Sequence, residues 1–421
     1  MFTFLHAADI HIDSPLQKLE RYEGAPVEEI RHAARRALEN LVKLAIDEKV
    51  AFVLISGDLY DGDWKDYNTG LYFVSQMTKL RKADIPVYII TGNHDAANKI
   101  TKNIRLPEGI HMFPAGKPGS FYLDDLDVAI HGQGFAAQAV KKDLSAGYPS
   151  PAAGCFNIGM LHTSVTGREG HEPYAPCTIE GLLSKGYDYW ALGHVHKREI
   201  LYEDPMIVFP GNIQGRNIRE TGPKGCLLVT VDEKRGTTAD FHSLDVIRWI
   251  HCEVDAAKAE SGYDVVDLVC SNLEKILEQS GSLPFIARIE INGLTPVHVE
   301  LSADPERWIN EIRSTAIDSG GGRIWIEKVK FATKLPIKKE PAELTDGPVG
   351  EILSFLDEVR SNPEMLKTFG EPLNELMKKL PRELKDGSDP IFPGDSKWLQ
   401  EILDEVQPLL LHRLMSKEET K

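Results

Sequence analysis

The sequence predicts an α/β protein, because short apolar strands alternate with amphipathic helices in its N-terminal part. Residues 2–8, 52–57 and 86–91 are rich in apolar, β-branched and aromatic side chains, which is typical of buried strands. Between these strands, apolar residues recur at helical spacing in 26–49 and 66–81. The order strand, helix, strand, helix, strand favours a parallel sheet covered by helices.

Further strands are predicted along the first half of the chain, at residues 127–132, 156–162 and 188–192. Later apolar runs follow one another without long helices between them, which favours a second, more antiparallel sheet. These runs are 206–210, 225–231 and 239–245. The N-terminal part is therefore expected to contain a mainly parallel sheet and a second sheet of different topology.

The pattern changes after about residue 245, where alternating strands and two helical segments predict a small α+β module. A linker that contains Pro336, Pro341 and Pro348 follows it. Amphipathic helices come last, and they either pack on the body of the protein or dock onto the helices of a partner. We expect three parts, which are residues 1–245, 246–338 and 339–421.

The composition indicates an ordinary globular protein of 421 residues, with 42% hydrophobic and 27% charged residues. No unbroken apolar run is long enough to span a membrane, and the N-terminus lacks the features of a signal peptide. The five cysteines are scattered, which argues against a disulfide framework and favours the cytoplasm. A net charge of −16 argues against nonspecific coating of nucleic acid.

Residues of the types that commonly bind metal ions stand at the ends of the predicted strands. They are Asp9, His11, Asp58, Asn93, His162, His194 and His196. The carboxyl ends of parallel strands meet at one edge of a sheet, so these side chains are expected to lie together. Mixed oxygen and imidazole ligands can hold two divalent cations side by side. Two such cations can clamp a phosphoryl group for in-line attack, so the pattern favours a phosphoesterase.

The motifs D-x-H, G-D-x-x-D, G-N-H-D, a lone histidine and G-H-x-H occur in this order, from Asp9 to His196. In this order they resemble the calcineurin-like metallophosphoesterases, and the resemblance covers about residues 1–245. It implies a four-layer αββα sandwich, followed here by a small α+β capping domain and a C-terminal helical segment. It also implies two divalent metal ions, with manganese expected, while the ligand set alone would also admit iron or zinc.

The resemblance implies a role for each residue of the motifs. One ion would be held by Asp9, His11, Asp58 and His196, and the other by Asp58, Asn93, His162 and His194. His94 matches the catalytic histidine of the family, and Asp95 matches the carboxylate that orients it. A hydroxide between the ions would attack phosphorus, while His94 stabilises the developing charge or protonates the leaving oxygen.

Two longer stretches, 57–64 and 210–225, resemble the SbcD-type DNA-repair exonucleases, and within them the bacterial YhaO-like group. The arginine that protein phosphatases carry after G-D-x-x-D is replaced by Gly62. The resemblance implies a homodimeric, metal-dependent DNA exonuclease whose C-terminal helices bind an SbcC-type coiled-coil ATPase. Asp61 stands where many relatives have a histidine, which predicts an acidic loop that repels phosphate.

Arg216, Arg219 and Lys224 lie in one of these stretches and are candidate contacts to DNA phosphates. The alternative is a surface loop in which an arginine pairs with Glu220. Two other functions stay open: hydrolysis of a small substrate such as a nucleotide or cyclic nucleotide, and a non-catalytic scaffold. Manganese-dependent release of mononucleotides from linear DNA distinguishes the exonuclease from the small-substrate enzyme, and substitution of His94 distinguishes both from the scaffold.

Overall fold

A computed structural model describes most of the chain. The described residues are 1–13, 27–61, 67–96, 105–165, 174–281, 283–336, 348–372, 379, 396, 398–400, 402–403, 406–407 and 410. Gly62, the linker from 337 to 347 and much of the last predicted helix lie outside them. The chain divides into two compact units, and the first contains Met1–His251, Leu277–Arg288 and Gly321–Glu327. Among the described residues, no helix combines the length and the apolar character needed to cross a membrane.

The first sheet has six strands in the order β12-β11-β1-β2-β3-β4. The strands are β1 (Phe2–Ala7), β2 (Phe52–Ser56), β3 (Val87–Ile90), β4 (Ile110–Met112), β11 (Gly225–Val231) and β12 (Thr237–Ser243). Strands β1 to β4 run parallel, and β11 pairs antiparallel with β1. The parallel arrangement predicted for the first three strands is confirmed.

The second sheet also has six strands, in the order β5-β6-β7-β8-β10-β9. They are β5 (Gly119–Leu123), β6 (Val128–Gly132), β7 (Phe156–His162), β8 (Tyr189–Gly193), β9 (Glu199–Glu203) and β10 (Met206–Phe209). Strands β6, β7, β8 and β10 are parallel, and β5 and β9 are antiparallel edges. The predicted second sheet of late strands is wrong, because β11 and β12 extend the first sheet and β10 extends the second.

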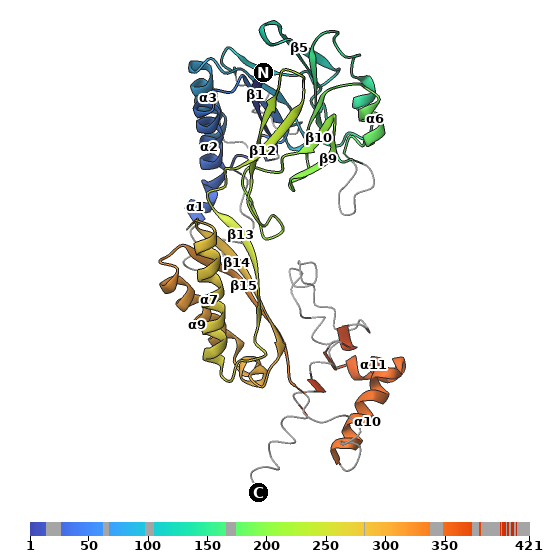
Figure 1. Ribbon diagram of the computed structural model, residues 1–421. Helices are drawn as coiled ribbons and strands as arrows, with labels where there is room; N and C mark the ends of the chain where they lie inside the picture. Colours follow the sequence, from blue (N-terminus) through green and yellow to red (C-terminus); the bar gives the residue numbers. More distant parts are fainter. Residues whose placement is uncertain are drawn as a thin grey trace. The chain divides into compact units, whose positions relative to one another are not determined.

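The two sheets pack face to face, and helices cover their outer faces (Figure 1). Alternation along β1 separates the layers: Phe4 lies in the core between the sheets, whereas Leu5 packs with the helices. Helices α2 (Ala33–Asp47) and α3 (Tyr67–Lys82) cover the first sheet. On the second sheet, the outer core includes Leu182 of the short helix α6 (Ile179–Leu183) and Trp190 of β8. The predicted four-layer αββα sandwich is confirmed.

The loop after β1 is fixed to both helices of the first outer layer. Asp13 is 6% exposed, and Nε of Arg35 on α2 donates a hydrogen bond to its Oδ1 atom at 2.6 Å. The hydroxyl of Thr69 on α3 donates to Oδ2 of Asp13 at 2.5 Å. A buried carboxylate is stable only with such partners, so these contacts hold the start of this loop in one conformation.

Strands β13 (Arg248–Asp255), β14 (Phe285–Leu294) and β15 (Ile324–Lys334) form a three-stranded sheet, with the helix α7 (Gly262–Gln279) between the first two in sequence. Helices α8 (His298–Ala303) and α9 (Pro305–Ser319) precede β15. The side chain of Asp304 caps α9 by accepting a hydrogen bond from the backbone N–H of Arg307. These elements agree with the strands and the two helices predicted for the α+β module, and α8 is additional.

The C-terminal helices α10 (Pro348–Ser361) and α11 (Pro363–Gly370) belong to the second unit. Asn362 ends the first and caps the second, because its side chain accepts hydrogen bonds from the backbone N–H groups of Glu364 and Met365. A small apolar core joins these helices to residues near the C-terminus. Its buried members are Leu356, Val359, Leu366, Leu399 and Leu403.

Candidate metal centre

The seven predicted ligands, which we call the metal centre, lie at the carboxyl ends of β1, β2, β3, β7 and β8. Four of them have positive φ angles: 51° for Asp9, 46° for His11, 50° for Asp58 and 105° for His194. L-residues rarely adopt such angles, and they cluster at functional sites where the surrounding structure enforces them. The chain therefore turns sharply at the strand ends, which directs these side chains to one place.

Two glycines make the close packing of the metal centre possible. Gly57 has φ of +93°, and a Cβ atom there would lie 2.3 Å from Nδ1 of His162. A Cβ atom at Gly92 would lie 2.2 Å from Oδ1 of Asp58. A larger residue at either position would displace a side chain of the metal centre.

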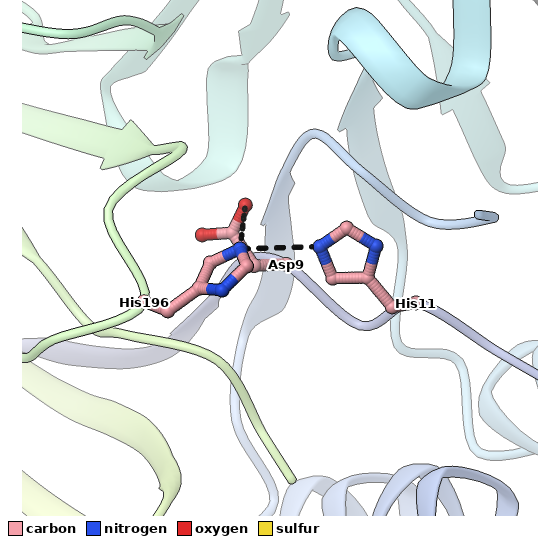
Figure 2. Close-up of side chains that lie close together, drawn as sticks. All are labelled: Asp9, His11 and His196. Atoms are coloured by element: carbon pink, nitrogen blue, oxygen red, sulfur yellow. Dashed lines mark hydrogen bonds and ion pairs between the residues drawn. The ribbon is translucent and has the colours of Figure 1, made fainter. Parts of the chain in front are cut away.

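Asp9, His11 and His196 form the first cluster, in which the potential ligand atoms lie within 4.8 Å of one another. The Nε2 atoms of His11 and His196 are 3.2 Å apart, and Nε2 of His196 is 3.9 Å from Oδ1 of Asp9. Figure 2 shows the His196 nitrogen facing both the His11 ring and the Asp9 carboxylate. Two nitrogens at this separation can both contact one ion at about 2.1 Å.

Asp58, His162 and His194 form the second cluster, again within 4.8 Å. Nε2 of His162 lies 3.0 Å from Oδ1 of Asn93 and 3.3 Å from Oδ2 of Asp58. The rings of His162 and His194 meet edge to face, with centroids 5.2 Å apart. This cluster offers imidazole nitrogens, a carboxylate and a neutral amide oxygen to a second ion.

Asp58 lies between the two clusters. Its Oδ2 atom is 3.9 Å from Nε2 of His11 in the first cluster and 3.3 Å from Nε2 of His162 in the second. A carboxylate has lone pairs for more than one ion, so Asp58 can serve as a shared ligand. The residues present therefore fit two adjacent divalent ions, as the sequence predicted.

Hydrogen bonds from outside the metal centre fix the orientation of its imidazoles. Nδ1 of His162 donates to the backbone carbonyl of Ser56 at 3.0 Å, and Nδ1 of His196 donates to Oε1 of Glu220 at 2.8 Å. In both rings this leaves Nε2 as the nitrogen that faces the centre. His6 is not part of the metal centre and lies buried beside Ser56, with Nδ1 2.9 Å from the Tyr189 hydroxyl.

The metal centre buries two carboxylates, since Asp9 and Asp58 are each 1% exposed. Burial raises the pKa of Asp9, and the nearby negative charge of Asp58 acts in the same direction. Burial lowers the pKa of His162, but the negative charge of Asp58 and their hydrogen bond raise it to about 9. A proton on His162 thus balances Asp58, and a divalent cation bound there would release that proton.

Asp61, and not Asp95, is the carboxylate in contact with His94. Nδ1 of His94 donates to Oδ1 of Asp61 at 2.7 Å, and this hydrogen bond raises the pKa of His94. Sequence reasoning treated Asp61 only as part of an acidic loop that repels phosphate. Its Oδ2 atom lies 3.5 Å from Nη1 of Arg216, and its Oδ1 atom lies 3.8 Å from Nδ1 of His11, so Asp61 has cationic and imidazole neighbours that offset its charge. The position of Asp61, three residues after a ligand, was the only signal for this contact in the sequence.

Asp95 holds the backbone of two loops together. Its carboxylate accepts hydrogen bonds from the backbone N–H groups of Leu59 at 3.1 Å, Tyr60 at 2.9 Å and Gly92 at 2.9 Å. Burial and the charge of Asp58 raise the pKa of Asp95 to about 6. The sequence-based assignment of Asp95 as the residue that orients His94 is therefore replaced by another role. Asp95 joins the loop after Asp58 to the start of the short helix α4 (Asn93–Ala96), which carries Asn93.

The three basic residues predicted to contact DNA lie in different surroundings. Lys224 is 8% exposed and donates a hydrogen bond from Nζ to the carbonyl of His196 at 3.0 Å. Arg216 is half-buried and lies 3.2 Å from the carboxylate of Glu220. Arg219 is exposed at the surface of the same loop. The predicted pair between an arginine and Glu220 is thus present, although Glu220 is only 8% exposed.

Comparison with known proteins gives two family matches. Residues 2–198 match the family "Calcineurin-like phosphoesterase", and residues 249–334 match "Metallophosphoesterase YhaO, middle domain". The first match contains all seven residues of the metal centre.

The chain is also similar to individual proteins and to a solved structure. The chain is 35% identical over 298 residues to "Uncharacterized metallophosphoesterase YhaO" of Bacillus subtilis (strain 168), which covers 70% of this chain and 72% of that protein. It is 22% identical over 373 residues to "DNA double-strand break repair protein Mre11" of Methanopyrus kandleri, and this alignment covers 82% of this chain and 73% of that protein. The superposition on the structure of TT1561 of Thermus thermophilus covers 58% of this chain and 99% of the TT1561 chain, with 13% sequence identity and a TM-score of 0.33.

The contact between Asp61 and His94 predicts how the pKa of that histidine responds to substitution. In the metal-free protein, Asp61→Asn should lower the pKa of His94, because a neutral amide no longer favours the charged imidazolium. NMR titration of the His94 ring measures this shift. Asp95→Asn is the comparison and should mainly reduce the free energy of unfolding, by about 1–3 kcal/mol. A larger change in the pKa of His94 from Asp95→Asn than from Asp61→Asn would restore the original assignment.

The order of the motifs, the two ligand clusters and the 35% identity over 298 residues to a metallophosphoesterase all lead to one family. Members of this family hydrolyse phosphoester bonds, and the donor atoms of this chain are arranged for the two metal ions that such chemistry uses. The chain belongs to the calcineurin-like metallophosphoesterases and is a phosphoester hydrolase.

Proposed function

We propose that this phosphoester hydrolase is a manganese-dependent DNA exonuclease that acts in DNA repair. The observation that carries the proposal is the similarity to a DNA double-strand break repair protein, which extends over 82% of this chain and well beyond the metal centre. The oxygen ligands Asp9, Asp58 and Asn93 support manganese, whereas the four imidazoles would also suit iron or zinc. The relative from Bacillus subtilis is named a metallophosphoesterase and supports hydrolysis without specifying a substrate.

Bound divalent ions would polarise the phosphoryl oxygens and supply a nucleophile near neutral pH. The residues of the chain position the other reactants. Asp9, Asp58 and the histidines around them would hold these ions. His94 lies beside His11, with ring centroids 5.0 Å apart, and its side chain is 35% exposed. It is therefore placed where a substrate can reach it from solvent.

His94 acts as the proton donor in this proposal. Its hydrogen bond to Asp61 favours the protonated ring, so His94 can carry a proton near neutral pH. As the bond between phosphorus and the leaving oxygen breaks, His94 transfers its Nε2 proton to that oxygen. Asp61 stabilises the imidazolium before the transfer and holds the ring in place.

Arg219 is the residue that we retain as a contact to DNA phosphates. It is exposed and lies in the loop that carries Glu220, which bonds the His196 ring. Lys224 supports the backbone at His196, and Arg216 is engaged by carboxylates of the protein. Removal of one phosphate contact should weaken DNA binding with little dependence on base sequence.

The exonuclease proposal predicts that the purified chain, loaded with manganese, releases mononucleotides from linear DNA but not from covalently closed circles. His94→Ser should reduce the rate about 10²- to 10⁴-fold, because the proton donor is lost. His251→Ser is a matched control at an exposed position outside the metal centre and should leave the rate unchanged. Labelled DNA with and without chelator measures both effects.

Hydrolysis of nucleotides or cyclic nucleotides, with linear DNA left intact, would contradict the DNA proposal and favour a small-substrate phosphoesterase. Equal rates for the wild type and His94→Ser would exclude His94 as the proton donor. Manganese content measured on both proteins ensures that the comparison is made at equal metal occupancy.

We propose in addition that residues 339–421 bind an SbcC-type coiled-coil ATPase. The apolar core of these helices leaves large apolar side chains at the surface, such as Phe355 at 50% and Phe369 at 49% exposed. A helical partner can cover side chains of this kind. We also propose that the protein is a homodimer. Leu71 on α3 is 63% exposed and is a candidate contact between the two subunits. A molecular mass of one chain, measured by light scattering, would reject the homodimer.

The partner proposal predicts that the double substitution Phe355→Ser and Phe369→Ser abolishes association with a coiled-coil ATPase from the same genome. Manganese-dependent hydrolysis should stay unchanged, since the metal centre lies in the other unit. Ile317→Ser, at an exposed apolar position on α9, is the control and should bind normally. Co-purification of the ATPase with the double variant at the wild-type level would contradict the proposal.

A further inference from the structure

Five side chains form a continuous row of contacts along one side of the metal centre. Starting from the candidate proton donor, Asp61 accepts a hydrogen bond from His94 and lies 3.5 Å from Nη1 of Arg216. Nη2 of Arg216 lies 3.2 Å from Oε1 of Glu220, which in turn accepts a hydrogen bond from His196 at 2.8 Å. The row therefore joins His94 to a ligand of the first cluster.

Glu220 uses both of its carboxylate oxygens. Oε1 accepts from Nδ1 of His196 at 2.8 Å and from the Arg216 guanidinium at 3.2 Å. Oε2 accepts from the Asn212 side chain and the Arg216 backbone N–H, both at 2.8 Å. The side chain is 8% exposed, so these contacts form largely away from water. A carboxylate held by four donors is a rigid support for the imidazole that it contacts.

Arg216 contacts carboxylates that come from two different loops. Asp61 follows β2 and Glu220 follows β10. The Arg216 side chain is 20% exposed, and its buried Nε atom has no hydrogen-bond partner among the described residues. Withdrawal of this guanidinium toward a substrate phosphate would remove a positive partner from two largely buried carboxylates at once, which is unfavourable.

We propose that Glu220 and Arg216 are positioning residues of the metal centre. Glu220 fixes the His196 ring so that Nε2 faces the ion of the first cluster. Arg216 holds Glu220 and Asp61 at a fixed separation, and thereby keeps His94 at a fixed position relative to the metal centre. The inference rests on metal-dependent phosphoester hydrolysis and does not depend on whether the substrate is DNA.

Positioning and substrate binding predict different kinetic changes. A positioning residue acts through other groups, so its loss disturbs metal affinity and kcat while KM for the substrate is largely retained. A residue that grips the phosphate equally in the ground state and the transition state changes KM and leaves kcat unchanged. Manganese affinity provides a readout that requires no activity at all.

The test compares Glu220→Gln and Arg216→Met with the wild-type full chain. Glu220→Gln keeps the shape of the side chain. In this variant, manganese should bind about 10- to 100-fold more weakly at one of the two sites, and titration calorimetry measures this change in affinity. Arg216→Met should lower kcat for bis-p-nitrophenyl phosphate and leave KM within about twofold. Glu233→Gln and Arg81→Met are matched controls at exposed positions and should behave as the wild type.

Wild-type manganese affinity and kcat in both variants would overturn the inference. So would a raised KM with unchanged kcat in Arg216→Met, which would instead identify Arg216 as a substrate contact. If Arg216→Met does not fold by circular dichroism, Arg216→Lys takes its place, and the same loss of kcat is expected because lysine cannot reach both carboxylates in the same geometry. A wild-type chain that binds no manganese would reject the proposed function itself, whatever the variants do.

Discussion

The burial of two carboxylates side by side is the constraint on which this structure depends. Asp9 and Asp58 are each 1% exposed and stand at the ends of adjacent strands. Two negative charges removed from water in this way are costly unless positive charge or hydrogen bonds compensate them. His162, whose pKa is raised to about 9, supplies a proton when no cation is bound, and divalent ions would supply the positive charge when they are bound. The same arrangement that destabilises the metal-free centre therefore gives it affinity for metal.

The fold meets this constraint through its backbone. Parallel strands bring their carboxyl ends to one edge, and positive φ angles at Asp9, His11, Asp58 and His194 turn the side chains inward. Backbone amides then complete the arrangement, since the N–H of His194 donates to Asp9 and that of His94 donates to Asp58. The surrounding fold thus holds these closely spaced side chains, and their strained backbone, in the geometry that hydrolysis requires.

The sequence predicted the parts of the structure that local patterns determine. The apolar runs identified β1, β2 and β3, and the ordered motifs identified seven candidate ligands that the structure brings together. The placement of β11 and β12 was wrong, because pairing between distant strands leaves no mark on hydrophobic periodicity. The contact of Asp61 with His94 was missed for a similar reason, since residues 33 positions apart on separate loops meet only after folding. Glu220 was considered as the partner of an arginine, but its bond to His196 was not anticipated.

The central claim is that Asp58 joins two ions in one centre, and anomalous X-ray diffraction from manganese-soaked crystals tests it most directly. We predict two anomalous peaks per chain in the wild type, one beside each cluster. In Asp58→Ala both peaks should be weaker, because each ion has lost a shared ligand. His196→Ala should weaken only the peak of the first cluster. A single peak in the wild type, or two undiminished peaks in Asp58→Ala, would contradict the account.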